Sequence, residues 1–158
     1  GLYYHFGVEK LDLPKKLFGI YKHRILKPNS PFFRGFNDEF LAPHSRATDV
    51  RLSDVEAIPE LEVMAVTKEG SLAIAKTTDS RQIFVTCHAE YDRDTLAKEY
   101  WRDMEKGLTT VDVPVNYFPD DDPKQDPLVT WRSTGQLLYS NWLNFYVYQS
   151  TPFDLNAI

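Results

Sequence analysis

His88 and Glu90 are the residues whose types and spacing are best suited to chemistry. They stand two positions apart, directly after the apolar run at residues 82–87. In an extended segment, residues i and i+2 project to the same side, so the carboxylate of Glu90 can hydrogen-bond to the imidazole of His88. Such a pair resembles the base and its orienting partner in a catalytic triad. A histidine that ends a strand beside an unrelated carboxylate would look the same, and spacing alone leaves both interpretations open.

A triad also needs a nucleophile, for which Cys87 and Ser45 are the candidates. Cys87, the single cysteine of the chain, adjoins His88 and should face the opposite side of an extended segment. A thiol that ends an apolar strand usually belongs to the core. Ser45 lacks the Gly-x-Ser-x-Gly surroundings that expose a hydrolase serine, and its neighbours favour ligand contact. We therefore expect no nucleophile within the chain.

The elements that position these residues are predicted from periodicity. The nearly continuous apolar run at residues 82–87 predicts a strand covered on both faces in a mainly parallel sheet. Residues 61–66 and 72–75 predict a hairpin, and residues 93–106 and 133–148 predict helices, the second of them largely buried. Residues 19–46 have the composition of loops over a scaffold, with a short strand near residues 21–26.

Together these elements predict an α/β fold with helices covering a sheet. In open α/β sheets the reactive crevice lies beyond the C-terminal ends of the strands, which is where His88 follows the 82–87 run. The acidic, proline-rich stretch at residues 119–127 is expected to be a solvated loop, because neighbouring Asp side chains diverge and cannot share a metal ion.

Composition limits the classes of function. With 158 residues, of which 42% are hydrophobic and 14% aromatic, the chain is large enough for one domain core. The net charge of -5 and the scattered basic residues argue against nucleic acid as a partner. The sequence contains no leader and no apolar run of bilayer length, so we expect a cytoplasmic protein without membrane contact. The crowded aromatic start at residues 1–7 predicts that further sequence precedes Gly1.

The segment Thr86-Cys87-His88-Ala89-Glu90-Tyr91-Asp92 resembles the Gly-His-Pro-Glu-Tyr-Asp signature of the homoserine O-succinyltransferase and O-acetyltransferase family. The resemblance extends over essentially the whole chain. Further similar segments lie at residues 34–36, 42–46, 113–119, 130–133 and 141–144. Two positions depart from the family pattern, because Cys87 and Ala89 stand where the family usually has Gly and Pro on either side of the histidine.

The resemblance implies the C-terminal part of a glutamine-amidotransferase-like, flavodoxin-like three-layer sandwich. Members of this family acylate the γ-hydroxyl of L-homoserine from an acyl-coenzyme A, at the start of methionine biosynthesis. Their nucleophile is a cysteine on a strand-to-helix elbow, and residues 1–4 resemble the helix that follows it. Residues 1–158 would thus form a single domain that is the C-terminal portion of a larger acyltransferase domain, without the nucleophile.

The resemblance also assigns roles to residues. His88 would be the general base and Glu90 would orient it, whereas Lys16, Ser45 and Arg102 match positions that contact substrate. Without the resemblance, Lys16 and Arg102 would be read as solvated charges. No metal and no resident cofactor are implied, because acyl-coenzyme A is a co-substrate. The expected partners are the small molecules L-homoserine and acyl-coenzyme A, and homodimer formation stays open.

The implied reaction has two steps, in which a thiolate first takes the acyl group and homoserine then attacks the thioester while His88 removes the proton. We expect the isolated chain to show no turnover. Two alternatives stay open: a glutamine-hydrolysing amidotransferase with the same fold, and an inactive fragment or module that binds coenzyme A or a partner subunit. The sequence does not choose between acetyl and succinyl donors, or between homoserine and serine acceptors.

Overall fold

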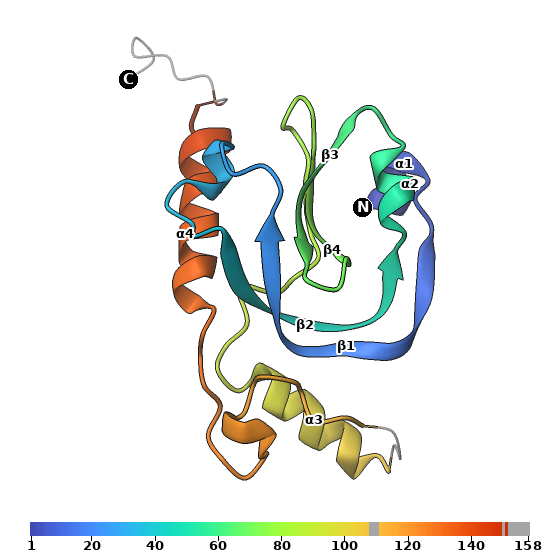
Figure 1. Ribbon diagram of the computed structural model, residues 1–158, viewed down its shortest axis with the longest axis vertical. Coiled ribbons are helices and arrows are strands. Elements are labelled where there is room, and N and C mark those ends of the chain that lie inside the picture. Colours follow the sequence, from blue (N-terminus) through green and yellow to red (C-terminus); the bar gives the residue numbers. More distant parts are fainter. Residues whose placement is uncertain (108–110, 150, 152–158) are drawn as a thin grey trace.

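The computed structural model describes residues 1–107, 111–149 and 151, and its centre is a five-stranded sheet in the order β2-β1-β3-β4-β5 (Figure 1). Every neighbouring pair of these strands is antiparallel. The strands are β1 (Lys10–Ile25), β2 (Glu39–Val50), β3 (Leu61–Thr67), β4 (Leu72–Thr77) and β5 (Ile83–Val85). The helices are α1 (Leu2–Phe6), η1 (Pro31–Phe33), α2 (Leu52–Glu56), α3 (Thr95–Glu105), η2 (Pro119–Asp121), α4 (Arg132–Trp142) and the π-helical turn η3 (Leu143–Val147).

Helices cover both faces of the sheet. Figure 1 shows α4 on one face and the short helices α1 and α2 on the other. A core that includes Phe33, Met64 and Leu138 fills the space beneath α4, and a second core that includes Val55 and Leu61 fills the space beneath α1 and α2. The chain therefore has helices on both faces of a sheet, which confirms the predicted α/β class and the three layers that the resemblance implied.

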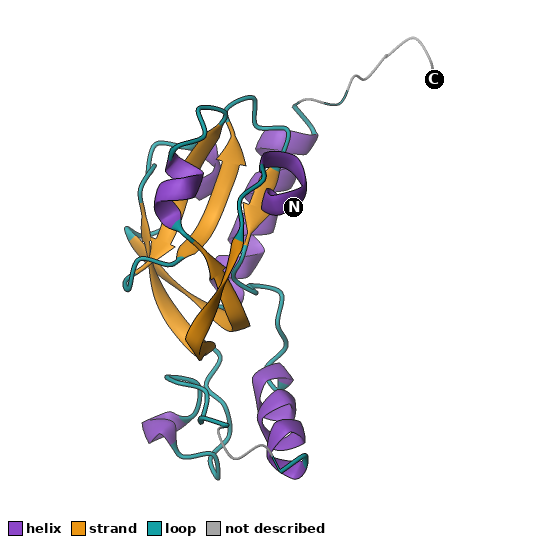
Figure 2. Cartoon of the chain, turned by 90° about the vertical axis from the view of Figure 1, so that its right-hand side faces the viewer, coloured by secondary structure: helices purple, strands orange, loops and turns teal. Residues whose placement is uncertain are grey.

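The first two strands are long and curl below the rest of the sheet (Figures 1 and 2). Their register shifts between Asp12 and Leu17, in a stretch that contains Pro14, which cannot donate a ladder hydrogen bond. Gly19 has a φ of 133°, and a Cβ at this position would lie 2.3 Å from the carbonyl oxygen of Val115. Only glycine therefore lets the 113–118 segment bond directly to β1, where Ile20 N–H donates to Val115 O at 2.8 Å.

This contact attaches a third core to the curled strands. Helix α3 and the segment that follows it form a lobe at the lower end of the molecule in Figure 1. The lobe packs Leu96 and Tyr100 of α3 with Tyr117 and Trp131 against Phe18 of β1. Because α3 is fixed to β1 in this way, side chains on both elements can meet at one place.

Several local predictions are confirmed and others are wrong. The hairpin is formed by β3 and β4, and α3 occupies most of residues 93–106. The expectation of a mainly parallel sheet around residues 82–87 is wrong within this chain, since β5 is short and pairs antiparallel with β4. Residues 19–25 and 39–46 belong to β1 and β2, so the prediction of loops over residues 19–46 is wrong for these two parts and holds for most of the residues between them. The last helix is also less buried than predicted, because Tyr139, Trp142 and Leu143 are each at least 40% exposed.

Candidate functional site

The backbone of residues 88–91 is held between β2 and α4. His88 N–H donates to Pro43 O of β2 at 2.8 Å, and the indole N–H of Trp131 donates to Tyr91 O at 2.9 Å. On the other side, α4 approaches so closely at Gly135 that an added Cβ would lie 2.5 Å from Ala89 O. The segment that carries the predicted base is therefore fixed by two elements distant in sequence, β2 and α4 with its N-cap residue Trp131.

The predicted pair is in hydrogen-bonding contact. His88 Nδ1 and Glu90 Oε1 are 2.8 Å apart, and the imidazole stacks on the Tyr91 ring with centroids 4.5 Å apart and an interplanar angle of 12°. Because the carboxylate accepts, Nδ1 carries the proton in the neutral ring and Nε2 is left as the proton acceptor. The His88 side chain is 36% exposed, so a substrate can reach it. This is the geometry of a base and its orienter.

Cys87 is unsuited to be the nucleophile. It is 3% exposed and lies in the core between the sheet and α4. Burial raises the pKa of its thiol to about 12, so the thiol stays protonated near neutral pH. The burial of Cys87 beside a partly exposed His88 is what the alternation of side chains in an extended segment predicts.

Lys16 and Ser45, two of the predicted substrate-binding residues, meet at one carboxylate. Lys16 Nζ lies 3.4 Å from Glu99 Oε2 of α3, and the Ser45 hydroxyl donates to the same oxygen. The Tyr91 hydroxyl donates to the other oxygen, Glu99 Oε1, at 3.4 Å. Glu99 thus connects both binding candidates to the aromatic ring that stacks on His88.

Arg102, the third predicted binding residue, extends this cluster along α3. Its Nε and Nη2 both lie 2.8 Å from Asp103 Oδ1, and Lys16 Nζ is 3.9 Å from Asp103 Oδ2. The hydrogen bond to Asp103 raises the pKa of Arg102, so its charge is permanent. The Arg102 side chain is 54% exposed and can offer its remaining donors to an anion.

The structure therefore brings all five predicted residues into one continuous set of contacts. Glu99 and Asp103, which hold the cationic side chains, are not among the site residues predicted from the sequence, and Tyr91 appears there only as part of a motif. Helical spacing could have revealed Glu99 and Asp103. Positions 102 and 103 follow position 99 by three and four residues, so the three side chains share one face of α3.

Two buried histidines lie behind the cluster. His23 of β1 and His44 of β2 are both 0% exposed, and their Nε2 atoms are 2.8 Å apart. Burial lowers the pKa of His23 to about 4 and that of His44 to about 2, so both rings are neutral at physiological pH. His44 directly precedes Ser45, so this pair supports the strand that carries a candidate binding residue.

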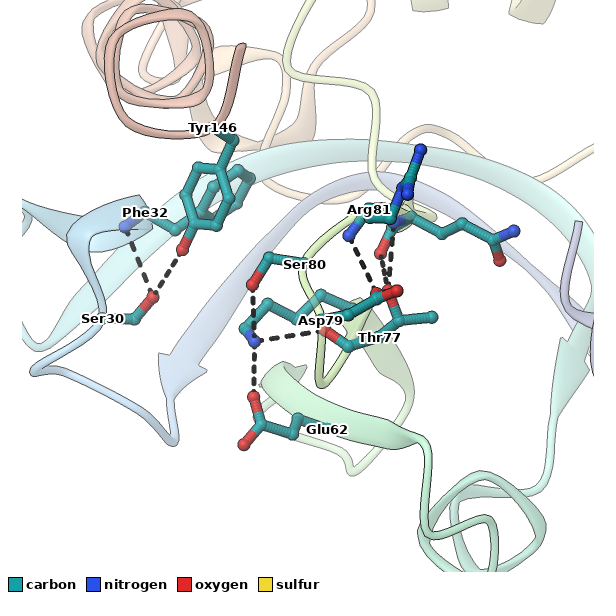
Figure 3. A network of polar contacts seen from close by, with 10 residues as sticks. Ser30, Phe32, Glu62, Thr77, Asp79, Ser80, Arg81 and Tyr146 are labelled. Atoms are coloured by element: carbon teal, nitrogen blue, oxygen red, sulfur yellow. Dashed lines mark hydrogen bonds and ion pairs between the residues drawn. The ribbon is translucent and has the colours of Figure 1, made fainter. Parts of the chain in front are cut away.

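Two cavities lie away from the His88 ring. The larger, of about 1090 Å³, is lined by β5, α4 and η3, and the smaller, of about 510 Å³, by residues that include Ser30, Glu62 and Lys76. Figure 3 shows the polar network at the smaller one, in which Lys76 Nζ lies 2.6 Å from Glu62 Oε2 and donates to Ser80 Oγ at 3.1 Å. Lys76 Nζ also donates to Thr77 O at 3.2 Å, so all three of its N–H donors are engaged within the protein and the network is structural.

Tyr139 is the residue of the larger cavity that is influenced by Glu90. Burial together with the negative charge of Glu90 raises the pKa of this tyrosine. Among the residues that the structure describes, no group of three or more His, Cys, Asp or Glu side chains could hold a metal ion. No helix in the same residues is both long and apolar enough to cross a bilayer.

The family model described as homoserine O-succinyltransferase matches residues 1–153. The chain belongs to this family. Proteins named homoserine O-acetyltransferase from Acetivibrio thermocellus and Brevibacillus brevis are each 54% identical to it over 99% of the chain. A third, from Thermotoga neapolitana, is 51% identical over the whole chain. In each case the chain spans 51% of the length of the relative.

Solved structures agree on the fold. A glutamine amidotransferase from Methylobacillus flagellatus matches with a TM-score of 0.55 at 16% identity, covering 87% of this chain and 55% of that one. A glutamine amidotransferase from Thermotoga maritima matches with a TM-score of 0.53 at 14% identity, covering 85% of this chain and 51% of that one. The predicted glutamine-amidotransferase-like α/β fold is therefore confirmed.

Proposed function

We propose that this chain supplies the catalytic base of a homoserine O-acyltransferase, with His88 as the base and Glu90 as the residue that orients it. The observation that carries the proposal is the 2.8 Å contact between His88 Nδ1 and Glu90 Oε1 on a partly exposed imidazole. It occurs in a chain that is 54% identical to proteins named homoserine O-acetyltransferase. The chain would be the C-terminal portion of one acyltransferase domain.

The reaction would proceed in two steps. A cysteine thiolate, supplied by the part of the relatives that this chain does not span, attacks the thioester carbon of acyl-coenzyme A and expels the coenzyme A thiolate. The γ-hydroxyl of homoserine then attacks the new thioester while His88 Nε2 takes its proton. The cysteine thiolate leaves, and Glu90 stabilises the imidazolium through Nδ1–H. The products are O-acylhomoserine and coenzyme A.

Substrate would be positioned by Lys16, Ser45 and Arg102. Two cations within one cluster suit the carboxylate of an amino acid, and Arg102 can bind it with two parallel hydrogen bonds. The Ser45 hydroxyl is placed to bond the acyl or hydroxyl oxygen. Glu99 and Asp103 hold these side chains in place through the contacts described above, which reduces the entropy lost when substrate binds.

The names of the relatives favour acetyl-coenzyme A as the donor, and the family name makes succinyl-coenzyme A the second donor to assay. We propose no resident cofactor, and we place the enzyme in the cytoplasm, where its small-molecule substrates would be available. The amidotransferase fold keeps glutamine hydrolysis as the competing activity, because it uses the same combination of Cys, His and Glu.

The test uses a single polypeptide in which the complementary half of the Acetivibrio thermocellus protein is fused to residues 1–158. We expect this fusion to form O-acetylhomoserine from acetyl-coenzyme A and L-homoserine, and residues 1–158 alone to form none. Release of ammonia from glutamine without acyl transfer by the fusion would overturn the proposal. Turnover by the isolated chain would overturn the assignment of the nucleophile to the other half.

A further inference from the structure

The Tyr91 side chain covers one face of the His88 imidazole. The two rings are nearly parallel, with an interplanar angle of 12° and centroids 4.5 Å apart. The torsion that turns a histidine ring about its Cβ–Cγ bond has broad minima, so a hydrogen bond through Nδ1 alone leaves the ring able to rock. A ring stacked on its face opposes this motion, because rocking would pull the two faces apart or press them together.

Tyr91 is itself held firmly at its backbone. Its carbonyl oxygen accepts from the indole N–H of Trp131 at 2.9 Å, and its N–H donates to His88 O at 3.2 Å. Trp131 is 1% exposed and belongs to the core that attaches α3 to β1, and the Tyr91 ring packs against the same core. The ring that faces His88 is therefore supported from behind.

The Tyr91 hydroxyl connects this ring to the proposed substrate-binding side chains. It donates to Glu99 Oε1 at 3.4 Å, whereas the other oxygen of that carboxylate lies 3.4 Å from Lys16 Nζ and accepts from Ser45. Burial, together with the negative charge of Glu99, raises the pKa of Tyr91 to about 12, so the phenol keeps its proton near neutral pH and remains a donor. One carboxylate thus contacts both the partner of the base and two of the binding residues.

We propose that Tyr91 is a positioning residue for His88, and that Glu99 fixes Tyr91 so that the base is held in register with the substrate-binding side chains. The inference deepens the proposed function and rests on it for the role of His88. Tyr91 acts through the imidazole: its stacked ring keeps Nδ1 directed at Glu90, which leaves Nε2 to accept the substrate proton. A merely structural role would lower stability without changing the tautomer of His88.

The first test observes the His88 ring and needs no turnover. ¹⁵N NMR of residues 1–158 above neutral pH reports which ring nitrogen is protonated, and the signals that His88→Asn removes are those of His88. Tyr91→Leu removes the stack and should raise the ratio of the Nε2-protonated to the Nδ1-protonated form roughly threefold or more. Tyr91→Phe keeps the stack and should stay close to the wild-type ratio.

Tyr100→Leu is the matched control for this measurement. Tyr100 is 6% exposed in the same core, and its ring meets Trp101 at a centroid distance of 4.8 Å. Its replacement removes an equal ring and should lower the unfolding temperature, but the tautomer of His88 should not change. If Tyr91→Leu does not fold, Tyr91→Met takes its place, because the flexible methionine fills the volume without a flat face.

The second test divides the effect between kcat and KM in the single-chain fusion. Tyr91→Leu should lower kcat about tenfold and change the KM for homoserine little, because a displaced base slows proton transfer without touching the binding residues. Glu99→Ala should lower kcat and also raise KM, since Lys16 and Ser45 lose their partner. Tyr91→Phe should lower kcat further in the wild type than in the Glu99→Ala background, where the contact of the hydroxyl is already absent.

Three outcomes would overturn the proposal: a wild-type tautomer ratio in Tyr91→Leu, an equal shift in Tyr100→Leu, or a loss of activity confined to KM. Independent effects of Tyr91→Phe and Glu99→Ala on kcat would overturn the part assigned to Glu99. A fusion without acyltransferase activity would sink the proposed function, whereas a His88 tautomer that still responds to Tyr91→Leu and not to Tyr100→Leu would leave the positioning role standing.

Discussion

The region around His88 and the region around β5 are separated only by Thr86 and Cys87. The side chains of the first region mostly contact other protein groups, whereas several side chains of the second are exposed to solvent. Around His88, polar and charged groups of β1, β2 and α3 bond to one another, as Lys16 and Ser45 do at Glu99. Around β5, by contrast, a strand edge and aromatic side chains face solvent. The comparison teaches that the chain positions its polar groups through its own contacts, whereas several of its large apolar side chains remain exposed.

If this comparison holds, substitutions around His88 should lower the rate of the reaction without destabilising the fold. The largest effect is expected from His88→Asn in the fusion, which removes the base and should lower kcat about a thousandfold. The side chain is partly exposed, so the unfolding temperature should change little. Steady-state kinetics and thermal unfolding check both statements. A large fall in the unfolding temperature together with the loss of activity would contradict the separation of the two regions.

Glu90→Gln should have the second largest effect, a fall in kcat of about a hundredfold, because the amide can hold Nδ1 but cannot stabilise the imidazolium. The activity that remains is measured as a function of pH. Glu56→Gln provides the control, since Glu56 is an exposed residue of α2 on the other side of the sheet. Equal losses in the two variants would show that Glu90 contributes only to the overall charge.

Arg102→Ala sharpens the comparison within the site itself. Loss of a charge-assisted clamp should raise the KM for homoserine roughly tenfold or more while kcat falls less. The matched control is Arg51→Ala, because Arg51 is also exposed and also pairs with an aspartate, Asp54, at 3.5 Å. The KM of the control should stay at the wild-type value. If KM is unchanged in Arg102→Ala, the carboxylate is bound elsewhere.

The smallest effect concerns the buried histidines. Their pKa values in the folded state, about 4 for His23 and about 2 for His44, lie below the unfolded value of 6.5. The unfolded chain therefore binds more protons than the folded chain below pH 6.5. The contribution of the two neutral histidines to the free energy of unfolding is complete above that pH and falls as the pH drops toward 4. The expected loss is on the order of 1 kcal/mol per pH unit for each histidine.

Urea unfolding between pH 7 and pH 5 measures this slope. His23→Asn keeps a polar side chain in the pair but removes one titrating group, so the stability of this variant should fall less steeply with decreasing pH. An unchanged slope would contradict the assignment of acid sensitivity to these rings. The His5→Asn variant is the control, because His5 is exposed on α1.

The parts of the fold that could be predicted are those governed by local periodicity. The apolar spacing of Leu96 and Tyr100 predicted α3, and the turn between two apolar runs predicted the β3–β4 hairpin. The spacing of His88 and Glu90 indicated their hydrogen bond, because two residues in an extended segment share a side.

The rest depends on contacts between distant segments. Residues 19–25 and 39–46 of the Pro- and Gly-rich stretch lie in long strands because β1 and β2 pair with each other and the 113–118 segment binds at Gly19. Glu99 joins Lys16 and Ser45 only because α3 packs against the curled strands. The exposure of Trp142 could not be foreseen either, since periodicity reports an apolar helix without saying what covers it.

The tautomer of His88 tests the central claim most directly, and it can be measured in residues 1–158 by ¹⁵N NMR of the ring nitrogens above neutral pH. We predict a neutral ring protonated at Nδ1, with that proton bonded to Glu90 and Nε2 unprotonated. Glu90→Ala should shift the ring toward the Nε2-protonated form. A wild-type ring already protonated at Nε2 would contradict the account, because the nitrogen that must accept the substrate proton would not be available.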